Sequence, residues 1–331
     1  MSGKTKIEWA EKTWNPIRAR TKADNLIQLA NGRGMLIKAG TWGYHCERVS
    51  PGCKNCYACT MNGRTLPAWG TGLDYTVPNR EKVEIYLDEH ELTAPLRWRK
   101  PATIFPCSMT DLFGEWVPDE MIDRMFAVMA LCPQHQFLVL TKRAKRMREY
   151  FVSMGGHFSF EYQQNPAKSV SRILPLENVR LGVSVEDQQR ADERIPELLA
   201  TPAASWWVSY EPALGPVDFT RYLPHGHNCN CGCGYDTRAL GIDWVVIGGE
   251  SGPGARPCDL AWARAVIAQC REARVPVFFK QAGARPYSPS DRITYRGCTL
   301  PMPQGFSRSL NDRKGGDPTE WPEDLRIRET P

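Results

Sequence analysis

The sequence predicts an α/β protein whose parallel strands form a full or partial (β/α) barrel. Six short segments in the middle of the chain are rich in Val, Ile, Phe and Trp, and most are continuously apolar, as strands buried on both faces are. Segments with helical periodicity separate them, and repeated strand–helix units give parallel sheets with right-handed crossovers. With one or two weaker strands near the N-terminus, this pattern indicates a TIM-like architecture. The six strand candidates are residues 103–108, 137–141, 179–185, 206–210, 244–247 and 275–280.

Three helices are expected between these strands, over residues 118–131, 187–199 and 260–273. In the first, Pro118 suits the first helical position. The same helix carries an apolar stripe that is typical of a core-facing side. The stripe consists of Met121, Ile122, Met125, Phe126 and Met129.

Composition sets the outer limits of the prediction. The chain has 331 residues, a net charge of +5 and 12 cysteines. No run of about 18 apolar residues is present, so we expect no membrane-spanning helix, and the N-terminus lacks the apolar stretch of a secretory signal. These features favour a cytoplasmic protein whose cysteines are free thiols or metal ligands. The mild positive charge permits a nucleic-acid partner without requiring one.

The most informative motif is a group of three cysteines, Cys46, Cys53 and Cys56, with a Pro-Gly turn at residues 51–52 between the first two. Three thiolates on a bent segment can converge on one soft metal. A structural zinc site requires four ligands, whereas a cubane iron–sulfur cluster held by three cysteines leaves one iron open. Because Cys59 offers a fourth thiolate, the spacing alone leaves zinc and iron–sulfur both open.

Polar residues follow every predicted strand, and in a parallel barrel the active site lies at these carboxyl ends. We therefore expect the polar residues at the six strand ends to line one site. They are Ser108 and Asp111, Lys142, Ser184, Glu211, Gly248 to Glu250, and Lys280. The glycines at 248 and 249 open a Gly-rich turn that either holds a cofactor's polar end or is a tight strand-to-helix connection.

A second cluster places five metal-ligating side chains within nine residues, and it predicts either a zinc-stabilised loop or a segment with incidental thiols. Its members are His225, His227, Cys229, Cys231 and Cys233. We expect one barrel domain over residues 1–285, with insertions at 18–42 and 223–240, followed by a loosely packed extension over 286–331.

Several motifs, spread over residues 6–283, together resemble a phage and prophage protein family of unassigned function. They include Thr-Trp-Asn-Pro at 13–16, Ser-Pro-Gly-Cys-Lys-Asn-Cys-Tyr-Ala at 50–58, Leu-Thr-Lys-Arg at 140–143, Ser-Tyr-Glu-Pro at 209–212 and Gly-Gly-Glu-Ser-Gly-Pro-Gly at 248–254. That family is in turn similar to radical SAM enzymes, which have a barrel and a three-cysteine cluster site. Their common spacing is C-x3-C-x2-C, whereas six residues separate Cys46 from Cys53 here.

This resemblance implies a [4Fe–4S] cluster on Cys46, Cys53 and Cys56, with S-adenosylmethionine (SAM) bound at the open iron and cleaved reductively. Two further groups of residues receive expected roles. Residues expected to hold SAM are Ser108, Asp111, Ser184, Gly248, Gly249 and Glu250, and those expected to meet the substrate are Lys142, Glu211 and Lys280.

The implied partners are an electron donor such as a flavodoxin or ferredoxin and a nucleic-acid substrate, in the host cytoplasm if the protein is phage-encoded. The basic runs at 97–100 and 142–146 favour nucleic acid. Two alternatives stay open: a non-catalytic iron–sulfur or zinc protein that binds nucleic acid, and a zinc-dependent hydrolase on a barrel.

Overall fold

The computed structural model of this chain describes residues 3–28, 34–64, 69–153, 157–160, 170–173, 175–224, 241–288, 292–295, 298–301 and 310–331. It divides into two compact units, each described here by itself. The first unit comprises Met1–Leu181 and Thr201–Ala204, and the second comprises Gly182–Ala200 and Ser205–Pro331. In the described part of the chain, no helix has the length and apolar composition needed to cross a membrane.

The first unit is built on a mostly parallel sheet. Its strand order is β1-β2-β8-β9-β12, in which only β1 and β2 are antiparallel among the pairs β1–β2, β2–β8 and β8–β9. Buried side chains such as Trp14, Ile104 and Phe137 fill its interior, which explains the continuous apolar runs in the sequence. The strands are β1 (Gly3–Lys4), β2 (Lys12–Trp14), β8 (Thr103–Pro106), β9 (Gln136–Thr141) and β12 (Val179–Val185).

The segment expected as an insertion at 18–42 contains short antiparallel strands that its sequence did not indicate. A three-stranded sheet has the order β6-β3-β7, and a separate hairpin pairs β4 with β5. These strands were missed because they are only two to five residues long. They are β3 (Ile17–Thr21), β4 (Asn25–Gln28), β5 (Gly34–Ile37) and β6 (Trp42–Gly43), and β7 (Val83–Leu87), which pairs with β3, lies outside this segment.

Helices pack against the sheet of the first unit. The predicted helix at 118–131 is confirmed as α5, although Pro118 caps it instead of occupying its first turn. Four of the five stripe residues, all except Met121, are buried. The unit also contains a hairpin of β10 and β11. The remaining elements are α1 (Tyr57–Arg64), α2 (Val77–Arg80), α3 (Glu89–Leu92), α4 (Ala94–Arg97), α5 (Asp119–Ala130), α6 (Ala144–Ser153), β10 (His157–Phe160) and β11 (Val170–Ile173).

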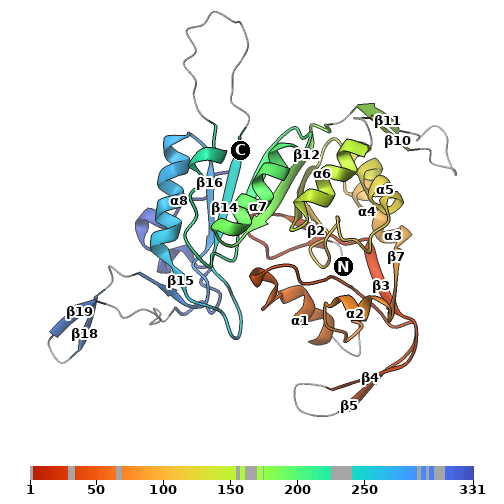
Figure 1. Ribbon diagram of the computed structural model, residues 1–331, viewed down its shortest axis with the longest axis horizontal. Helices are drawn as coiled ribbons and strands as arrows, with labels where there is room; N and C mark the ends of the chain where they lie inside the picture. Colours follow the sequence, from red (N-terminus) through yellow and green to blue (C-terminus); the bar gives the residue numbers. More distant parts are fainter. Residues whose placement is uncertain are drawn as a thin grey trace, which may run out of the picture. The chain divides into compact units, whose positions relative to one another are not determined.

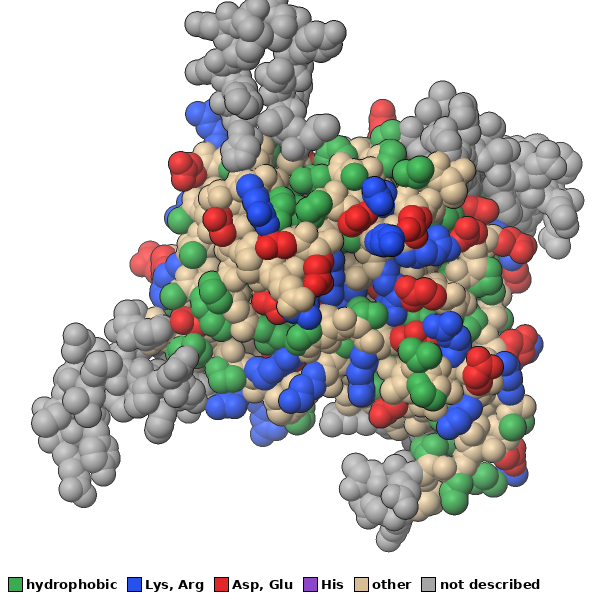
Figure 2. Space-filling model, in the orientation of Figure 1, with side chains coloured by type: hydrophobic (Ala, Val, Ile, Leu, Met, Phe, Trp, Pro, Cys, Tyr) green, Lys and Arg blue, Asp and Glu red, His purple; other side chains and the backbone are tan. Residues whose placement is uncertain are grey.

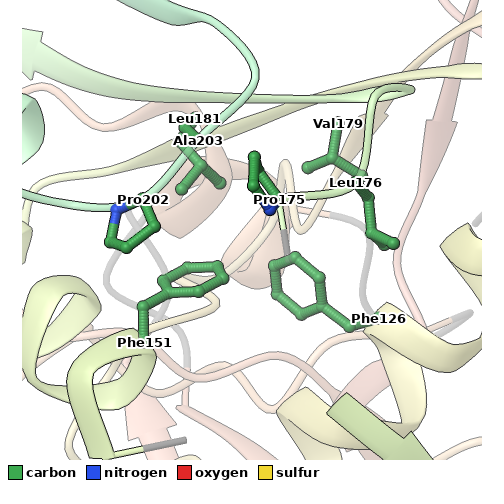
Figure 3. A pocket seen from close by; sticks show the side chains of 8 residues that line it. All are labelled: Phe126, Phe151, Pro175, Leu176, Val179, Leu181, Pro202 and Ala203. Atoms are coloured by element: carbon green, nitrogen blue, oxygen red, sulfur yellow. The ribbon is translucent and has the colours of Figure 1, made fainter. Parts of the chain in front are cut away.

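A small apolar pocket lies in the core of the first unit (Figure 3). Phe126 of α5 and Phe151 of α6 face Leu176, Val179 and Leu181 across it. The two phenylalanine rings meet edge to face, with centroids 5.3 Å apart. This contact joins α5 to α6 beside the start of β12.

The second unit contains the other half of the predicted parallel pattern. After the last four residues of β12, the order continues β13-β14-β16, with both β13–β14 and β14–β16 parallel. The predicted helices at 187–199 and 260–273 are confirmed as α7 and α8, and α8 lies alongside β16 in Figure 1. The elements are β13 (Trp206–Tyr210), β14 (Trp244–Gly248), β16 (Val277–Gln281), α7 (Gln188–Leu199) and α8 (Leu260–Glu272).

The end of the chain differs from the loosely packed extension expected there. Trp321 and Leu325 are buried, and the ring of Trp321 meets Phe279 edge to face at 4.8 Å. Residues 327–329 run along β16, where Phe279 N–H donates to the Ile327 carbonyl at 2.8 Å. The tail is held by backbone hydrogen bonds and by the side chains of Trp321 and Leu325, and such contacts leave no apolar periodicity in the sequence. The remaining short strands are β15 (Cys258–Asp259), β17 (Pro286–Tyr287), β18 (Arg292–Tyr295) and β19 (Cys298–Pro301).

The predicted α/β class and the mostly parallel strand arrangement are therefore confirmed. All six strand candidates are strands, with ends shifted by at most two residues. Closure of these strands into a barrel stays a prediction.

The pocket predicts a large stability difference between two apolar truncations. Phe126→Ala removes a buried ring that contacts Tyr150 and Phe151, so we expect it to lower the free energy of unfolding by about 3–5 kcal/mol. Leu26→Ala truncates a side chain that is 77% exposed and should cost less than about 0.5 kcal/mol. Chemical denaturation of both variants tests this, and equal losses would contradict the packing described.

Candidate functional site

The cysteine loop of the first unit is shaped by a short 3₁₀ turn and a helix start. The turn covers Pro51–Cys53, and α1 begins at Tyr57, so Cys56 directly precedes the first helical residue. Burial raises the pKa of Cys56, and the backbone N–H groups of Ala58 and Cys59 in the first turn of α1 oppose this effect.

The three predicted ligands lie near one another. Burial raises the pKa of Cys46, and the charge of Asp111 raises it further, against the opposing charge of Arg143; the thiols of Cys56 and Cys53 add smaller increases. Burial also raises the pKa of Cys56. Cys46 and Cys56 pack against a buried cluster that includes Tyr75 and Met109. Within the described residues, no group of three or more His, Cys, Asp or Glu side chains is already arranged around one point.

Cys59 differs from the other three cysteines in its partner. Its thiol donates to the Oδ1 atom of Asp74 at 3.6 Å, and Asp74 also lies 3.8 Å from the Arg48 guanidinium. The Cys59 side chain is therefore engaged by a carboxylate outside the group formed by Cys46, Cys53 and Cys56.

The residues that flank Cys46 are held from several sides. The Tyr44 N–H donates to Asn62 at 3.0 Å, and Thr110 Oγ1 donates to the His45 carbonyl at 2.6 Å. The Glu47 carboxylate is 5% exposed, and the Arg80 guanidinium donates to it with two hydrogen bonds of 2.6 and 2.8 Å. The backbone on both sides of Cys46 is thereby anchored to α1, α2 and the end of β8.

Arg143 is the hub of this region. Its side chain is 5% exposed and donates to Asp111 at 3.2 Å, to Glu115 at 2.7 Å and to the Glu47 carbonyl at 3.2 Å. Its guanidinium lies 4.5 Å from the centre of the Trp116 ring. Burial alone would lower the pKa of Arg143, but the charges of Asp111 and Cys46 outweigh it, so the pKa is raised.

The Trp116 ring closes the region around Arg143. The ring is buried, and His45 meets it edge to face at 5.2 Å. Its indole Nε1 is also buried, and it has no hydrogen-bond partner in the part of the chain that the structure describes.

Three predicted strand-end residues of the first unit lie beside the cysteine loop. The positive charge of Lys142 lowers the pKa of Cys56, opposing the effect of burial, and the Ser108 carbonyl accepts a hydrogen bond from the Tyr57 hydroxyl. The Asp111 carboxylate accepts from Thr141 Oγ1 at 2.6 Å, from the Lys142 N–H at 3.0 Å and from Arg143. Asp111 thus joins the ends of β8 and β9, and its role toward SAM stays a prediction.

In the second unit, the ends of β13, β14 and β16 bring together Glu211, Gly248 and Lys280. The Lys280 Nζ atom lies 2.6 Å from Glu211 Oε1, and the two side chains are 15% and 18% exposed. The Gln281 side chain donates to the same Glu211 oxygen at 3.3 Å and to the Gly249 carbonyl at 2.8 Å. This juxtaposition agrees with the parallel strand order.

The glycines at 248 and 249 have a steric role in this cluster. A Cβ atom on Gly248 would come within 3.1 Å of the Glu211 carboxyl carbon, and one on Gly249 would come within 2.4 Å of the Ala282 carbonyl oxygen. Gly249 must therefore lack a side chain for the turn to pack, whereas a side chain at 248 would require the Glu211 carboxyl group to shift by a few tenths of an ångström. Cofactor contact by these two residues stays a prediction.

Glu250 and Ser184 are each engaged by an arginine. Both carboxylate oxygens of Glu250 accept hydrogen bonds from the Arg256 guanidinium, at 2.9 and 2.5 Å. The Arg194 guanidinium donates to the Ser184 carbonyl at 2.7 Å and to the buried Glu186 carboxylate at 3.1 Å. Sequence reasoning did not assign functional roles to Glu47 and Arg80, which are 33 residues apart, or to Arg256, because a charge pattern does not reveal which side chains pair.

The candidate zinc residues, His225, His227, Cys229, Cys231 and Cys233, lie outside the described residues.

The basic segment at 142–146 is occupied mainly within the protein. Arg143 is buried, Arg146 pairs with Asp119, and Lys145 lies 3.9 Å from Glu149. On the face shown in Figure 2, Lys and Arg side chains are interspersed with Asp and Glu. This surface gives the nucleic-acid prediction no added support.

A model of a protein family described as "Protein of unknown function (DUF5131)" matches residues 40–311, which include the cysteine loop and every strand end discussed above. No curated protein and no solved structure matches the chain.

The Glu211–Lys280 pair should be energetically coupled. In a double-mutant cycle with Glu211→Gln and Lys280→Met, we expect a coupling free energy of about 0.5–3 kcal/mol, because both side chains are mostly buried and in contact. Lys145 and Glu149 form a matched exposed pair, which should couple by no more than about 0.5 kcal/mol. Chemical denaturation of the wild type and of the three variants in each cycle measures both values, and a coupling at 211–280 no larger than at 145–149 would refute the expectation.

Proposed function

The chain belongs to the DUF5131 family, and for it we propose an iron–sulfur enzyme of the radical SAM type. The observation that carries the proposal is the arrangement of Cys46, Cys53 and Cys56 on an anchored loop beside two positive charges. The proposal extends to barrel closure of the strands and to a phage origin of the family, both of which rest on the sequence resemblance.

The chemistry of these residues fits a [4Fe–4S] cluster. Three nearby thiols supply the required soft ligands, and Cys59 is engaged by Asp74. A cluster held by thiolates carries negative charge. The positive charges of Arg143, near Cys46, and of Lys142, near Cys56, would partly offset it. Burial raises the pKa of Cys56, and the N–H groups of Ala58 and Cys59 oppose that effect.

In this proposal, a bound cluster together with SAM supplies one-electron cleavage of the cofactor's sulfonium group. The chain's own residues bind and orient. Cys46, Cys53 and Cys56 hold the iron, while Lys142 presents its ammonium group beside Cys56. The Ser108 carbonyl accepts from Tyr57 at the start of α1, and Asp111 holds Arg143, which donates to the loop at Glu47.

The second unit offers groups for the substrate and for SAM. Lys280 donates a hydrogen bond to Glu211 Oε1 at 2.6 Å, and in this proposal the pair would contact a polar group of the substrate. Glu250 would have to exchange Arg256 for the amino group of SAM, since Arg256 contacts both of its carboxylate oxygens. Ser184, Gly248 and Gly249 complete the proposed SAM contacts. A flavodoxin or ferredoxin is the proposed electron donor, and nucleic acid is the proposed substrate class.

The ligand assignment predicts which cysteine variants lose iron. Cys46→Ala, Cys53→Ala and Cys56→Ala should each lose most of the iron from anaerobically purified protein. Cys59→Ala is the matched control and should retain it, because Cys59 contacts Asp74. Iron analysis and visible absorption measure the outcome. Full iron retention in any of the first three variants would exclude that residue as a ligand, and a colourless wild-type protein containing zinc would favour one of the alternatives.

The proposed reaction predicts cleavage of SAM. Anaerobic incubation of the iron-loaded protein with SAM and dithionite should yield 5′-deoxyadenosine, detected by liquid chromatography and mass spectrometry. The Cys53→Ala protein, treated in the same way, is the control and should yield none. If the brown wild-type protein gives no 5′-deoxyadenosine, the iron–sulfur site survives and the radical SAM assignment fails.

A further inference from the structure

We propose that Arg143 is a positioning residue for the metal-binding loop, which it holds through the Glu47 carbonyl while placing a buried positive charge beside Cys46. This inference rests on the proposed function, because it concerns the cluster that Cys46 would help to hold. It assigns a role to a residue that is 97 positions away from that cysteine in the sequence.

The geometry of Arg143 distinguishes it from an ordinary surface cation. Its three nitrogens donate to three separate acceptors: Asp111, Glu115 and the Glu47 carbonyl. The Trp116 ring covers the guanidinium at 4.5 Å. A planar guanidinium can satisfy such a fan of acceptors at once, whereas a lysine ammonium presents a point charge with a different geometry.

The contact with Glu47 gives this geometry a consequence at the cysteine. The Glu47 carbonyl belongs to the residue directly after Cys46, and the Cys46 thiol itself points to that oxygen at 3.9 Å. On the other side of Cys46, Thr110 Oγ1 holds the His45 carbonyl. The two carbonyls that flank the cysteine are therefore both fixed by side chains from the ends of β8 and β9, so the direction of the Cys46 side chain is set before any metal binds.

The other contact of Arg143, with Asp111, makes the arrangement rigid. Asp111 is itself held by Thr141 Oγ1 and by the Lys142 N–H, so its carboxylate cannot follow a moving arginine. Residues that orient metal ligands in this way typically change metal affinity by about 10–100-fold when they are replaced. Arg143 also brings a positive charge close to Cys46, and such a charge favours the reduced, more negative form of a bound cluster.

Two variants of Arg143 separate geometry from charge. Arg143→Met removes both, and Arg143→Lys keeps the charge but loses the fan of hydrogen bonds. Arg146→Met is the matched control, because it removes the same charge three residues later on α6, where the partner is Asp119. Iron loss would be followed in anaerobically purified proteins challenged with a ferrous chelator, and the cluster's midpoint potential would be measured by a redox titration monitored by visible absorption and electron paramagnetic resonance.

We expect both Arg143 variants to lose iron at least about tenfold faster than wild type. The Arg146→Met protein should stay within about twofold of wild type, since it leaves the Glu47 carbonyl held. The midpoint potential should become more negative in Arg143→Met and stay near the wild-type value in Arg143→Lys. Iron retention at the wild-type rate in Arg143→Met would overturn the inference. If only the Arg143→Lys protein lost iron at the wild-type rate, the positioning role would be overturned. If the midpoint potential of the cluster in Arg143→Met equalled that of the wild type, the role of the charge would be overturned.

A further variant covers the case in which Arg143→Met does not fold, because it leaves Asp111 buried without its cation. Thr110→Val is nearly isosteric and releases only the His45 carbonyl on the other side of Cys46. It should fold as wild type by circular dichroism and lose iron faster, and wild-type iron retention would contradict the idea that the flanking carbonyls set Cys46. If wild-type protein itself binds no iron–sulfur cluster, the proposed function fails first, so the two failures are distinguishable.

Discussion

The ion pair between Asp111 and Arg143 is the interaction on which the arrangement of the first unit's site depends. Two nearly buried charges are costly unless they are hydrogen-bonded. Here the carboxylate also accepts from the end of β9, and all three guanidinium nitrogens donate, to Asp111, Glu115 and the cysteine loop. The end of one strand, the start of a helix and a loop from much earlier in the chain are thereby tied to one pair of charges. Removing one partner would leave the other uncompensated in the interior.

The same principle operates in the second unit with different residues. There the strand ends carry Glu211 and Lys280, and the neighbouring loop carries Glu250 and Arg256. In both units, therefore, an acid at a strand end is matched by a base from another element. Such pairing keeps polar groups at the ends of buried strands without leaving them unsatisfied. Chemistry at these positions would have to work by exchanging partners within an existing network.

The parallel strands could be predicted because burial on both faces leaves a strong apolar signal, as in 179–185 and 206–210. The short antiparallel strands between 17 and 43 leave no such signal, since they are held by local backbone pairing. At the site, the positions of Asp111, Lys142 and Glu211 followed from strand order. The partners of these side chains could not be predicted. Arg143, the partner of Asp111, also contacts Glu47, which is 96 residues away in the sequence and is brought close only by the folding of the cysteine loop. Likewise, glycine is required at 249 because the Ala282 carbonyl oxygen lies where a Cβ atom would be, which no local pattern reveals.

The last residues of the chain protect the edge of a sheet. β16 is the final strand in the order of the second unit, and a strand at that position normally offers an open row of backbone groups to other chains. Here the Phe279 N–H, the Val277 carbonyl and the Val277 N–H are all used by residues 327–329. The C-terminus thus acts as a built-in guard against intermolecular strand pairing. Without residues 327–329, these backbone groups of β16 would be unpaired and could form hydrogen bonds with strands of other molecules. The solubility of such a shortened chain would therefore fall even if its interior packed as before.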